Sequence, residues 1–244
     1  MYTREEFEKL RIDQSQKMYQ DEGLKKDALN VLCQADKYHW IHQTTWQGEP
    51  VLQLPQDMFA VQEIILETKP DHIIEVGVAW GGSTLFYSSI MSIYGGKSII
   101  GVDTYMPDDM VDRISNKNCG VEIIYIESSS LNNALLTEIN ARLESDKCMV
   151  ILDSHHTHNH VLAELNKYSP LVGKGHYIIC SDTIIEDMPE LHRNREWDKG
   201  NSPRTALEEF LSKNKYFERD ERIRNKLLIS CHADGYLRRK ACQE

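Results

Sequence analysis

The chain has 244 residues, of which 41% are hydrophobic, enough for one large domain with its own core. It carries 28 basic and 38 acidic residues, and the formal net charge of −10 argues against a nucleic-acid partner, because a phosphate backbone would be repelled. No apolar run approaches the ~20 residues that span a bilayer, and the N-terminus MYTREEFEKLRIDQ is charged where a signal peptide is apolar. We therefore expect a cytoplasmic protein without a membrane span.

Residues 1–50 differ from the rest of the chain. They mix charged side chains with Trp40 and Trp46 and show only weak helical periodicity. No repeat, low-complexity tract or linker divides the remaining residues. We predict an N-terminal helical arm or cap over residues 1–50 and a single further domain over residues 51–244.

Helical and strand patterns alternate from residue 54 onward. Leu54, Met58, Val61 and Ile65 form a helical stripe that ends before Pro70. Five short runs rich in Ile and Val predict strands, namely HIIEVGV, SIIGVD, EIIYIE, CMVILD and YIICSD. Apolar strands separated by amphipathic helices predict an α/β fold with a mostly parallel sheet covered by helices on both faces.

The C-terminal segment predicts a different ending. SPRTALEEFLSKN is typical of a helix with Ser202 as N-cap and Pro203 as its first residue. The following YFERDERIRNKLLISCHADGYLRR predicts a strand, a turn and a strand, which would add an antiparallel pair to the sheet.

Ligands of open α/β sheets bind at the carboxyl ends of the strands. In this chain the predicted strands end in acidic residues around a glycine: Glu75 with Gly77, Asp103, Glu127, Asp153 and Asp182.

The stretch IIEVGVAWGGST, residues 73–84, places a glycine turn after the first strand. It misses the triphosphate motif because Ser83 replaces the phosphate-binding lysine, and it misses the dinucleotide motif because Ala79 would crowd a pyrophosphate. Glu75 favours a ligand with cationic groups, and S-adenosylmethionine has such groups, a carboxylate for the helix start and a ribose for Asp103. A tight turn without a ligand is the alternative.

LDSHHTHNH places four histidines just after a predicted buried strand. It lacks the zinc-protease pattern, because His156 is followed by Thr157 rather than by glutamate. Asp153, His156 and His160 form a possible iron-binding set, kept as an outside alternative. We expect His158 and His160 to be solvated helix residues.

Asp153 and His156 lie where the reactive end of the cofactor would be. An alcohol has a pKa far above 7, so its methylation needs a base or a bound cation. Asp153 is the candidate to hold the cation, and His156 is the candidate to take the proton.

The chain also resembles the cephalosporin hydroxylase family, a group of class I S-adenosylmethionine-dependent methyltransferases that includes rhamnosyl O-methyltransferases. The likeness runs from about Trp46 to Arg239 and includes QLPQDMFAVQEII, IIEVGVAWGGSTLF, IGVD, VILDSHHTHNHVLAELNKYSPLV, SDT, ALEEFL and DGYLRR. It implies a Rossmann-like, mostly parallel seven-stranded sheet with an antiparallel C-terminal strand. It also implies Mg²⁺-assisted methyl transfer to a hydroxyl of a sugar or glycosylated natural product, by a homo-oligomer.

Carried over by position, the resemblance implies a set of site residues. His156 would be the catalytic base and Asp153 and Asp182 the metal ligands. The residues expected at the cofactor are Glu75, Gly77, Gly81, Ser83, Asp103, Ser129 and Asp153.

The chain departs from the family pattern at one position. Ser181, Asp182 and Thr183 stand where the family usually has Glu-Asp-Thr, so one carboxylate is missing. Glu186 and Asp187 follow closely as substitutes, although a solvated loop explains them equally well. We therefore expect weak, substrate-assisted binding of Mg²⁺.

Two other functions stay open on sequence alone: an iron- or nicotinamide-dependent oxidoreductase, and a cofactor-binding subunit without chemistry of its own. Acceptor specificity is expected in the N-terminal arm and in the loops at about 105–120 and 188–200. Those loops carry Arg113, Arg193, Arg195 and Trp197.

Overall fold

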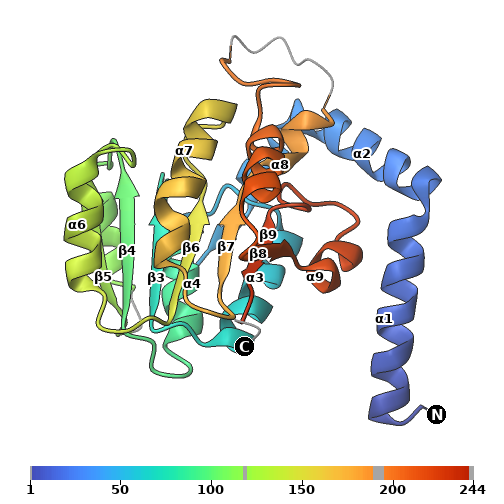
Figure 1. Ribbon diagram of the computed structural model, residues 1–244, viewed down its shortest axis with the longest axis horizontal. Helices are drawn as coiled ribbons and strands as arrows, with labels where there is room; N and C mark the ends of the chain where they lie inside the picture. The colour runs from blue at the N-terminus through green and yellow to red at the C-terminus, as the bar shows by residue number, and fades with distance from the viewer. Residues whose placement is uncertain (1, 118–119, 189–194, 242–244) are drawn as a thin grey trace.

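A computed structural model describes residues 2–117, 120–188 and 195–241 (Figure 1). In chain order the elements are α1 (Arg4–Gln20), α2 (Glu22–Asp36), η1 (Trp40–Gln43), β1 (Thr45–Trp46), β2 (Glu49–Pro50), α3 (Pro55–Thr68), β3 (His72–Val76), α4 (Gly82–Met91), β4 (Ser98–Asp103), α5 (Met110–Ser115), β5 (Glu122–Glu127), α6 (Asn133–Arg142), β6 (Cys148–Leu152), α7 (His158–Tyr168), η2 (Ser169–Leu171), β7 (Tyr177–Cys180), η3 (Thr183–Glu186), α8 (Pro203–Lys213), β8 (Phe217–Arg219), α9 (Glu221–Lys226) and β9 (Tyr236–Arg239).

The main sheet has seven strands in the order β5-β4-β3-β6-β7-β9-β8. Strands β3 to β7 pair in parallel, whereas β9 pairs antiparallel with both β7 and β8. The predicted mostly parallel sheet with an antiparallel C-terminal strand is confirmed. The predicted simple turn between the last two strands is wrong, because α9 and a loop occupy that segment.

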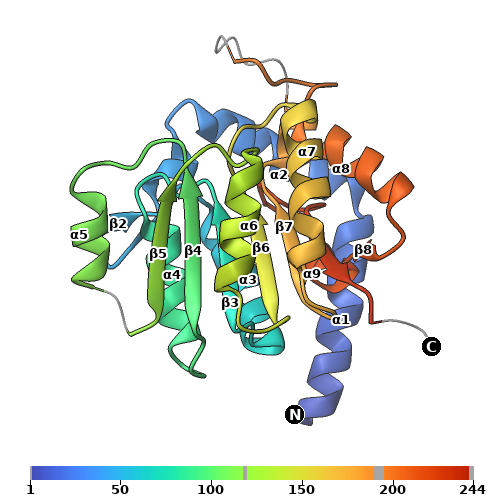
Figure 2. The same ribbon diagram turned by 60° about the vertical axis from the view of Figure 1, so that its left-hand side comes forward.

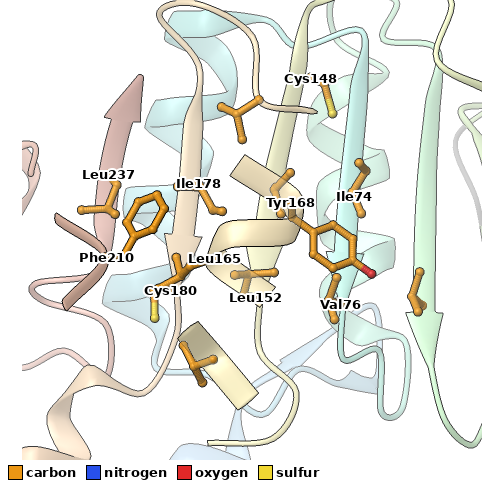
Figure 3. Packing of buried hydrophobic residues seen from close by; sticks show 14 of the residues in the cluster. Ile74, Val76, Cys148, Leu152, Leu165, Tyr168, Ile178, Cys180, Phe210 and Leu237 are labelled. Atoms are coloured by element: carbon orange, nitrogen blue, oxygen red, sulfur yellow. The ribbon is translucent and has the colours of Figure 1, made fainter. Parts of the chain in front are cut away.

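Helices cover both faces of this sheet, and the side chains of β3 alternate between them. Ile73 packs with α3 and α4 on one face, whereas Ile74 and Val76 pack with α6, α7 and α8 on the other. Figure 3 shows the second of these layers, with Tyr168 and Phe210 lying against the strands. Covering on both faces explains why the central strands are mostly apolar, with His72 and Glu75 of β3 as buried polar exceptions. The edge strand β5 is only partly buried.

The N-terminal arm packs beside the C-terminal helix α9. Helix α1, all of which the structure describes, buries none of its residues and lies beside α9, apart from the sheet (Figures 1 and 2). The guanidinium of Arg224 lies 4.5 Å from the ring centre of Tyr19 at this contact. Further along, the β1–β2 hairpin packs on α4, where Trp46 Nε1 donates to Ser89 Oγ at 3.1 Å. Sequence periodicity did not predict this hairpin.

Because β3, β4, β6 and β7 run parallel, their carboxyl ends meet at one edge of the sheet. The turn after β3, the end of β4 and the segments after β6 and β7 therefore lie close together. None of the helices in the described ranges is both long and apolar enough to cross a membrane.

Candidate active site

The turn between β3 and α4 requires its glycines. Gly77 has φ +94°, and a Cβ at this position would lie 2.0 Å from the carbonyl oxygen of Asp153. Gly81 has φ +79° and is the N-cap of α4. The N-cap makes no side-chain hydrogen bond at this helix start, and Ser83 in its first turn lines the cavity described below.

Glu75 lies beneath this turn. Its side chain is buried, and its two carboxylate oxygens accept hydrogen bonds from the hydroxyls of Ser83 and Thr84 in α4. Burial raises the pKa of Glu75 to about 8, because a charge loses its hydration there, and the two hydroxyl bonds oppose this shift. Glu75 therefore anchors the start of α4 to the sheet.

Asp103 ties the end of β4 to the same turn. Its Oδ2 accepts hydrogen bonds from the backbone amides of Val78 and Ala79, at 2.8 and 3.1 Å, and its Oδ1 accepts from the amide of Thr104 at 2.7 Å. The carboxylate thus fixes the turn from which a cofactor would be bound.

A cavity of about 560 Å³ opens at this edge of the sheet. Five of the residues expected at the site line it: Gly77, Ser83, Asp153, His156 and Asp182. Four others are not among the described residues that line it: Glu75, Gly81, Asp103 and Ser129. Ser129 is exposed in the turn after β5, where its Oγ accepts from the amide of Leu131 at 3.4 Å.

Asp153, His156 and Asp182 face one another in the cavity, each offering a ligand atom within 4.8 Å of the others. His156 Nε2 lies 3.3 Å from Asp182 Oδ2. Burial raises the pKa of Asp153 to about 6, and the nearby charge of Asp182 adds to the shift. Two facing carboxylates with open space before them fit Mg²⁺, which prefers oxygen ligands and keeps several waters.

Three of the six non-glycine residues with positive φ in the described ranges line this cavity. Asp182, Ala79 and Leu52 all line it, and all three have positive φ angles, of +55°, +49° and +59°. Such conformations are unfavourable for residues other than glycine, and they persist where the surrounding structure imposes them, typically at functional sites.

The iron-binding alternative is not assembled in the described part of the chain. His160 Nε2 lies 3.0 Å from Glu164 Oε1, and His160 does not belong to the group formed by Asp153 and His156. The prediction that His158 and His160 are solvated is also wrong. Both are partly buried, and His158 contacts side chains of α8, because α7 packs closely on that helix.

The two nearby carboxylates proposed as substitutes have other partners. Glu186 accepts hydrogen bonds from the amide of Gly200 and from Ser202 Oγ, and Asp187 forms an ion pair with Arg204. Neither belongs to the metal-ligating group found among the described residues. Ser181 Oγ is buried and has no hydrogen-bond partner among the described residues. Since Ser181 is neutral and Glu186 and Asp187 have other partners, this segment does not replace the missing charge.

Aromatic and basic side chains border the cavity next to His156. The ring of Trp197 packs edge-on against His156, with 4.9 Å between ring centres, and the guanidinium of Arg195 lies 5.4 Å from the centre of Trp197. Arg113 instead forms an ion pair with Glu49 in the hairpin. Arg193 lies outside the described residues.

Sequence reasoning missed several residues of the site. Asp36, Ile41 and His42 from the N-terminal arm line the cavity. Gln53 Nε2 donates to Asp153 Oδ2 at 3.2 Å, and the ring of His232 accepts a bond from the backbone amide of Asp182. Gln53 falls in the quoted segment QLPQD, whereas no pattern pointed to His232.

The strand order, the glycine turn after β3 and the acidic residues at the strand ends together define a class I S-adenosylmethionine-dependent methyltransferase. The family model described as "Rhamnosyl O-methyltransferase/CmcI" matches residues 38–240, and the chain belongs to this family. A curated relative, the rhamnosyl O-methyltransferase of Mycobacterium leprae (strain TN), is 34% identical over 170 residues, which are 65% of this chain and 72% of the relative. The resemblance seen in the sequence and the prediction of an S-adenosylmethionine-dependent O-methyltransferase are thereby confirmed.

Solved structures show the same fold. The CmcI apo-structure is 19% identical, covers 82% of this chain and 78% of its own, and superposes with a TM-score of 0.59. A structure of CmcI described with Mg and SAM is 21% identical with the same coverage and a TM-score of 0.57. The cofactors expected from the sequence are therefore those bound by a structural neighbour.

Proposed function

We propose that this protein transfers the methyl group of S-adenosylmethionine to a hydroxyl of a sugar or of a glycosylated natural product, with Mg²⁺ as the assisting cation. The arrangement of Asp153, His156 and Asp182 at the cavity, within 4.8 Å of one another, carries the proposal. It supplies two oxygen ligands for a hard cation and a basic nitrogen next to them.

Different described residues would bind the cation and the cofactor. When bound, S-adenosylmethionine supplies an electrophilic methyl group and Mg²⁺ stabilises an alkoxide. Asp153 and Asp182 would hold the cation through their carboxylates. The turn at Gly77 and the uncapped start of α4 would bind the amino-acid end of the cofactor.

His156 is assigned the role of the base that takes the proton from the acceptor hydroxyl. Mg²⁺ prefers oxygen to imidazole ligands, so the nitrogen of His156 stays available beside the cation. Its packing against Trp197 orients the ring, and with Nε2 lying 3.3 Å from Asp182 Oδ2 the nitrogen left to accept the proton is Nδ1. A positioned general base contributes typically 10²–10⁴-fold to the rate.

The cavity wall suits a carbohydrate acceptor. Trp197 offers an aromatic surface, and Asp36, His42, Arg195 and Asp198 offer polar groups for hydroxyls. Rhamnosyl O-methyltransferases are the curated relatives, which supports a sugar as the acceptor.

The test is methyl transfer with labelled S-adenosylmethionine over a panel of sugars and glycosides, with Mg²⁺ and with EDTA. We expect turnover with a glycosylated acceptor that EDTA abolishes and Mg²⁺ restores. In parallel, S-adenosylhomocysteine should raise the melting temperature, whereas NAD, or 2-oxoglutarate with iron, should not. Binding of S-adenosylhomocysteine without turnover over the panel would contradict the proposal. A cytoplasmic location and a homo-oligomer remain predictions; light scattering tests the second.

A further inference from the structure

We infer that the start of α3 positions both metal-binding carboxylates, with Gln53 as the positioning residue of Asp153 and His232 as that of Asp182. The inference rests on the metal site of the proposed function. It concerns side chains that would not touch the metal, and it explains how two ligands on different strand ends are held in register.

The first connection is direct. Gln53 is buried, and its Nε2 donates to Asp153 Oδ2 at 3.2 Å. It precedes Leu54, the N-cap of α3, whose side chain is completely buried. Because Pro55 begins the helix immediately afterwards, the backbone of Leu54, next to Gln53, is restricted to its extended conformation. The amide therefore holds one carboxylate oxygen of Asp153 in place and leaves the other for a ligand.

The second connection starts from Asp57 in the first turn of α3. Its carboxylate is completely buried and accepts three hydrogen bonds from the C-terminal part of the chain. The donors are Ser230 Oγ, the backbone amide of Cys231 at 2.8 Å and the hydroxyl of Tyr236 at 3.0 Å. A buried carboxylate with three donors is a stable anchor for the segment that carries them.

A continuous chain of hydrogen bonds leads from this anchor to Asp182. The backbone amide of His232 donates to Ser230 Oγ at 3.0 Å, and the backbone amide of Asp182 donates to His232 Nδ1 at 3.0 Å. Ser230 Oγ thus donates to Asp57 and accepts from His232, and one hydroxyl can do both because it has one proton and two lone pairs. Ser230 and His232 are both buried, so water would not easily replace either bond.

The bond from His232 matters because of the backbone at Asp182. With φ +55°, Asp182 is in the left-handed region, which is uncommon for residues other than glycine, although aspartate tolerates it better than most. His232 satisfies the amide in this conformation and so holds the carboxylate toward Asp153. In this bond Nδ1 accepts from the amide, so the ring proton belongs on Nε2, which is buried and has no hydrogen-bond partner among the described residues.

Mn²⁺ binding tests the inference without any measurement of turnover. The free Mn²⁺ signal is followed by electron paramagnetic resonance during titration of the full chain with S-adenosylhomocysteine bound. We expect His232→Ala and Gln53→Met each to weaken Mn²⁺ binding by about 10–100-fold, the usual effect of losing a partner of a metal ligand. His232→Asn should recover most of the affinity, because its side-chain oxygen can accept the bond from Asp182.

His72→Ala is the matched control. His72 is also a buried histidine, and its Nε2 accepts a backbone amide bond, from Glu144 at 3.2 Å, but it lies at the amino end of β3, the opposite edge of the sheet. It should lower the melting temperature and leave Mn²⁺ affinity unchanged. Ser230→Ala breaks the chain by removing a single oxygen, so it provides a reading if His232→Ala does not fold.

The outcomes separate this inference from the proposed function. Suppose that the wild type binds Mn²⁺ and that Gln53→Met keeps this affinity. If His232→Ala, or Ser230→Ala in its place, also keeps it, the inference is overturned and the proposed function stands. An equal loss of affinity in His72→Ala would also overturn it, since general destabilisation would then be the cause. A wild type that binds S-adenosylhomocysteine but no Mn²⁺ would overturn the metal site and this inference together, and would leave methyl transfer to be explained without a cation.

Discussion

Replacing Glu75 by Gln should change how stability depends on pH. The substitution keeps the shape of the side chain and a carbonyl oxygen for Ser83 or Thr84, while it removes a buried group that titrates. Burial has raised the pKa of Glu75 to about 8 in the folded protein, so the folded state holds a proton that the unfolded chain releases near pH 4.5.

The sign and size of the effect follow from these two values. A raised pKa contributes stability that is fully present below pH 4.5 and is lost as the pH rises through about 8. At about 1.36 kcal/mol for each unit of pKa difference, the loss has a ceiling of about 5 kcal/mol. Glu75→Gln lacks this loss, so its stability relative to wild type should increase between pH 5 and pH 8.5.

Urea unfolding of both proteins at half-unit steps of pH measures the difference, and all other titrating groups cancel between them. Glu127→Gln is the control, because Glu127 is an exposed carboxylate at the end of β5. A difference between wild type and Glu75→Gln that stays constant from pH 5 to pH 8.5 would refute the reasoning, since Glu75 would then be ionised throughout in the folded protein.

Three further predictions concern the cofactor, the base and the metal. Asp103→Ala should weaken S-adenosylmethionine binding by about 1.5–3 kcal/mol for each lost charge-assisted bond, and unchanged affinity in calorimetry would remove Asp103 from the cofactor site. His156→Ala should keep cofactor affinity while turnover falls by about 10²–10⁴, and full activity would move the base to another residue. Ser181→Glu should lower the Mg²⁺ concentration needed for half-maximal methyl transfer and Asp182→Ala should raise it; a Mg²⁺ titration with identical midpoints in both would place the cation elsewhere.

Much of the fold could be predicted because the pattern of the central strands has a direct physical cause. Strands β3 and β6 are buried on both faces; β6 is apolar along its length and β3 is apolar except at His72 and Glu75, and such apolar runs are what the sequence pattern detects. The N-cap of α8 was equally visible, since Ser202 and Pro203 satisfy the helix start locally. The position of helix α1 within the predicted helical arm could not be given, because none of its residues is buried and no apolar stripe marks it.

The sequence predicts only those site residues that lie at the ends of neighbouring strands. Asp153 and Asp182 come after β6 and β7, which pair in parallel, so their meeting follows from the topology. Gln53 lies 100 residues from Asp153 in the chain, and His232 lies 50 residues from Asp182. Contacts of this separation depend on tertiary packing, which no local pattern encodes.

The cavity wall built by the N-terminal arm has a consequence for how such enzymes diversify. Asp36, Ile41 and His42 belong to a segment outside the parallel sheet, while the metal carboxylates belong to the strand ends. If this cavity binds the acceptor as proposed, mutations in the arm would reshape its wall without replacing the groups at the strand ends. Under the proposed function, exchanging residues 36–42 between relatives is therefore expected to alter the preferred acceptor while Asp153, His156 and Asp182 keep their places at the strand ends.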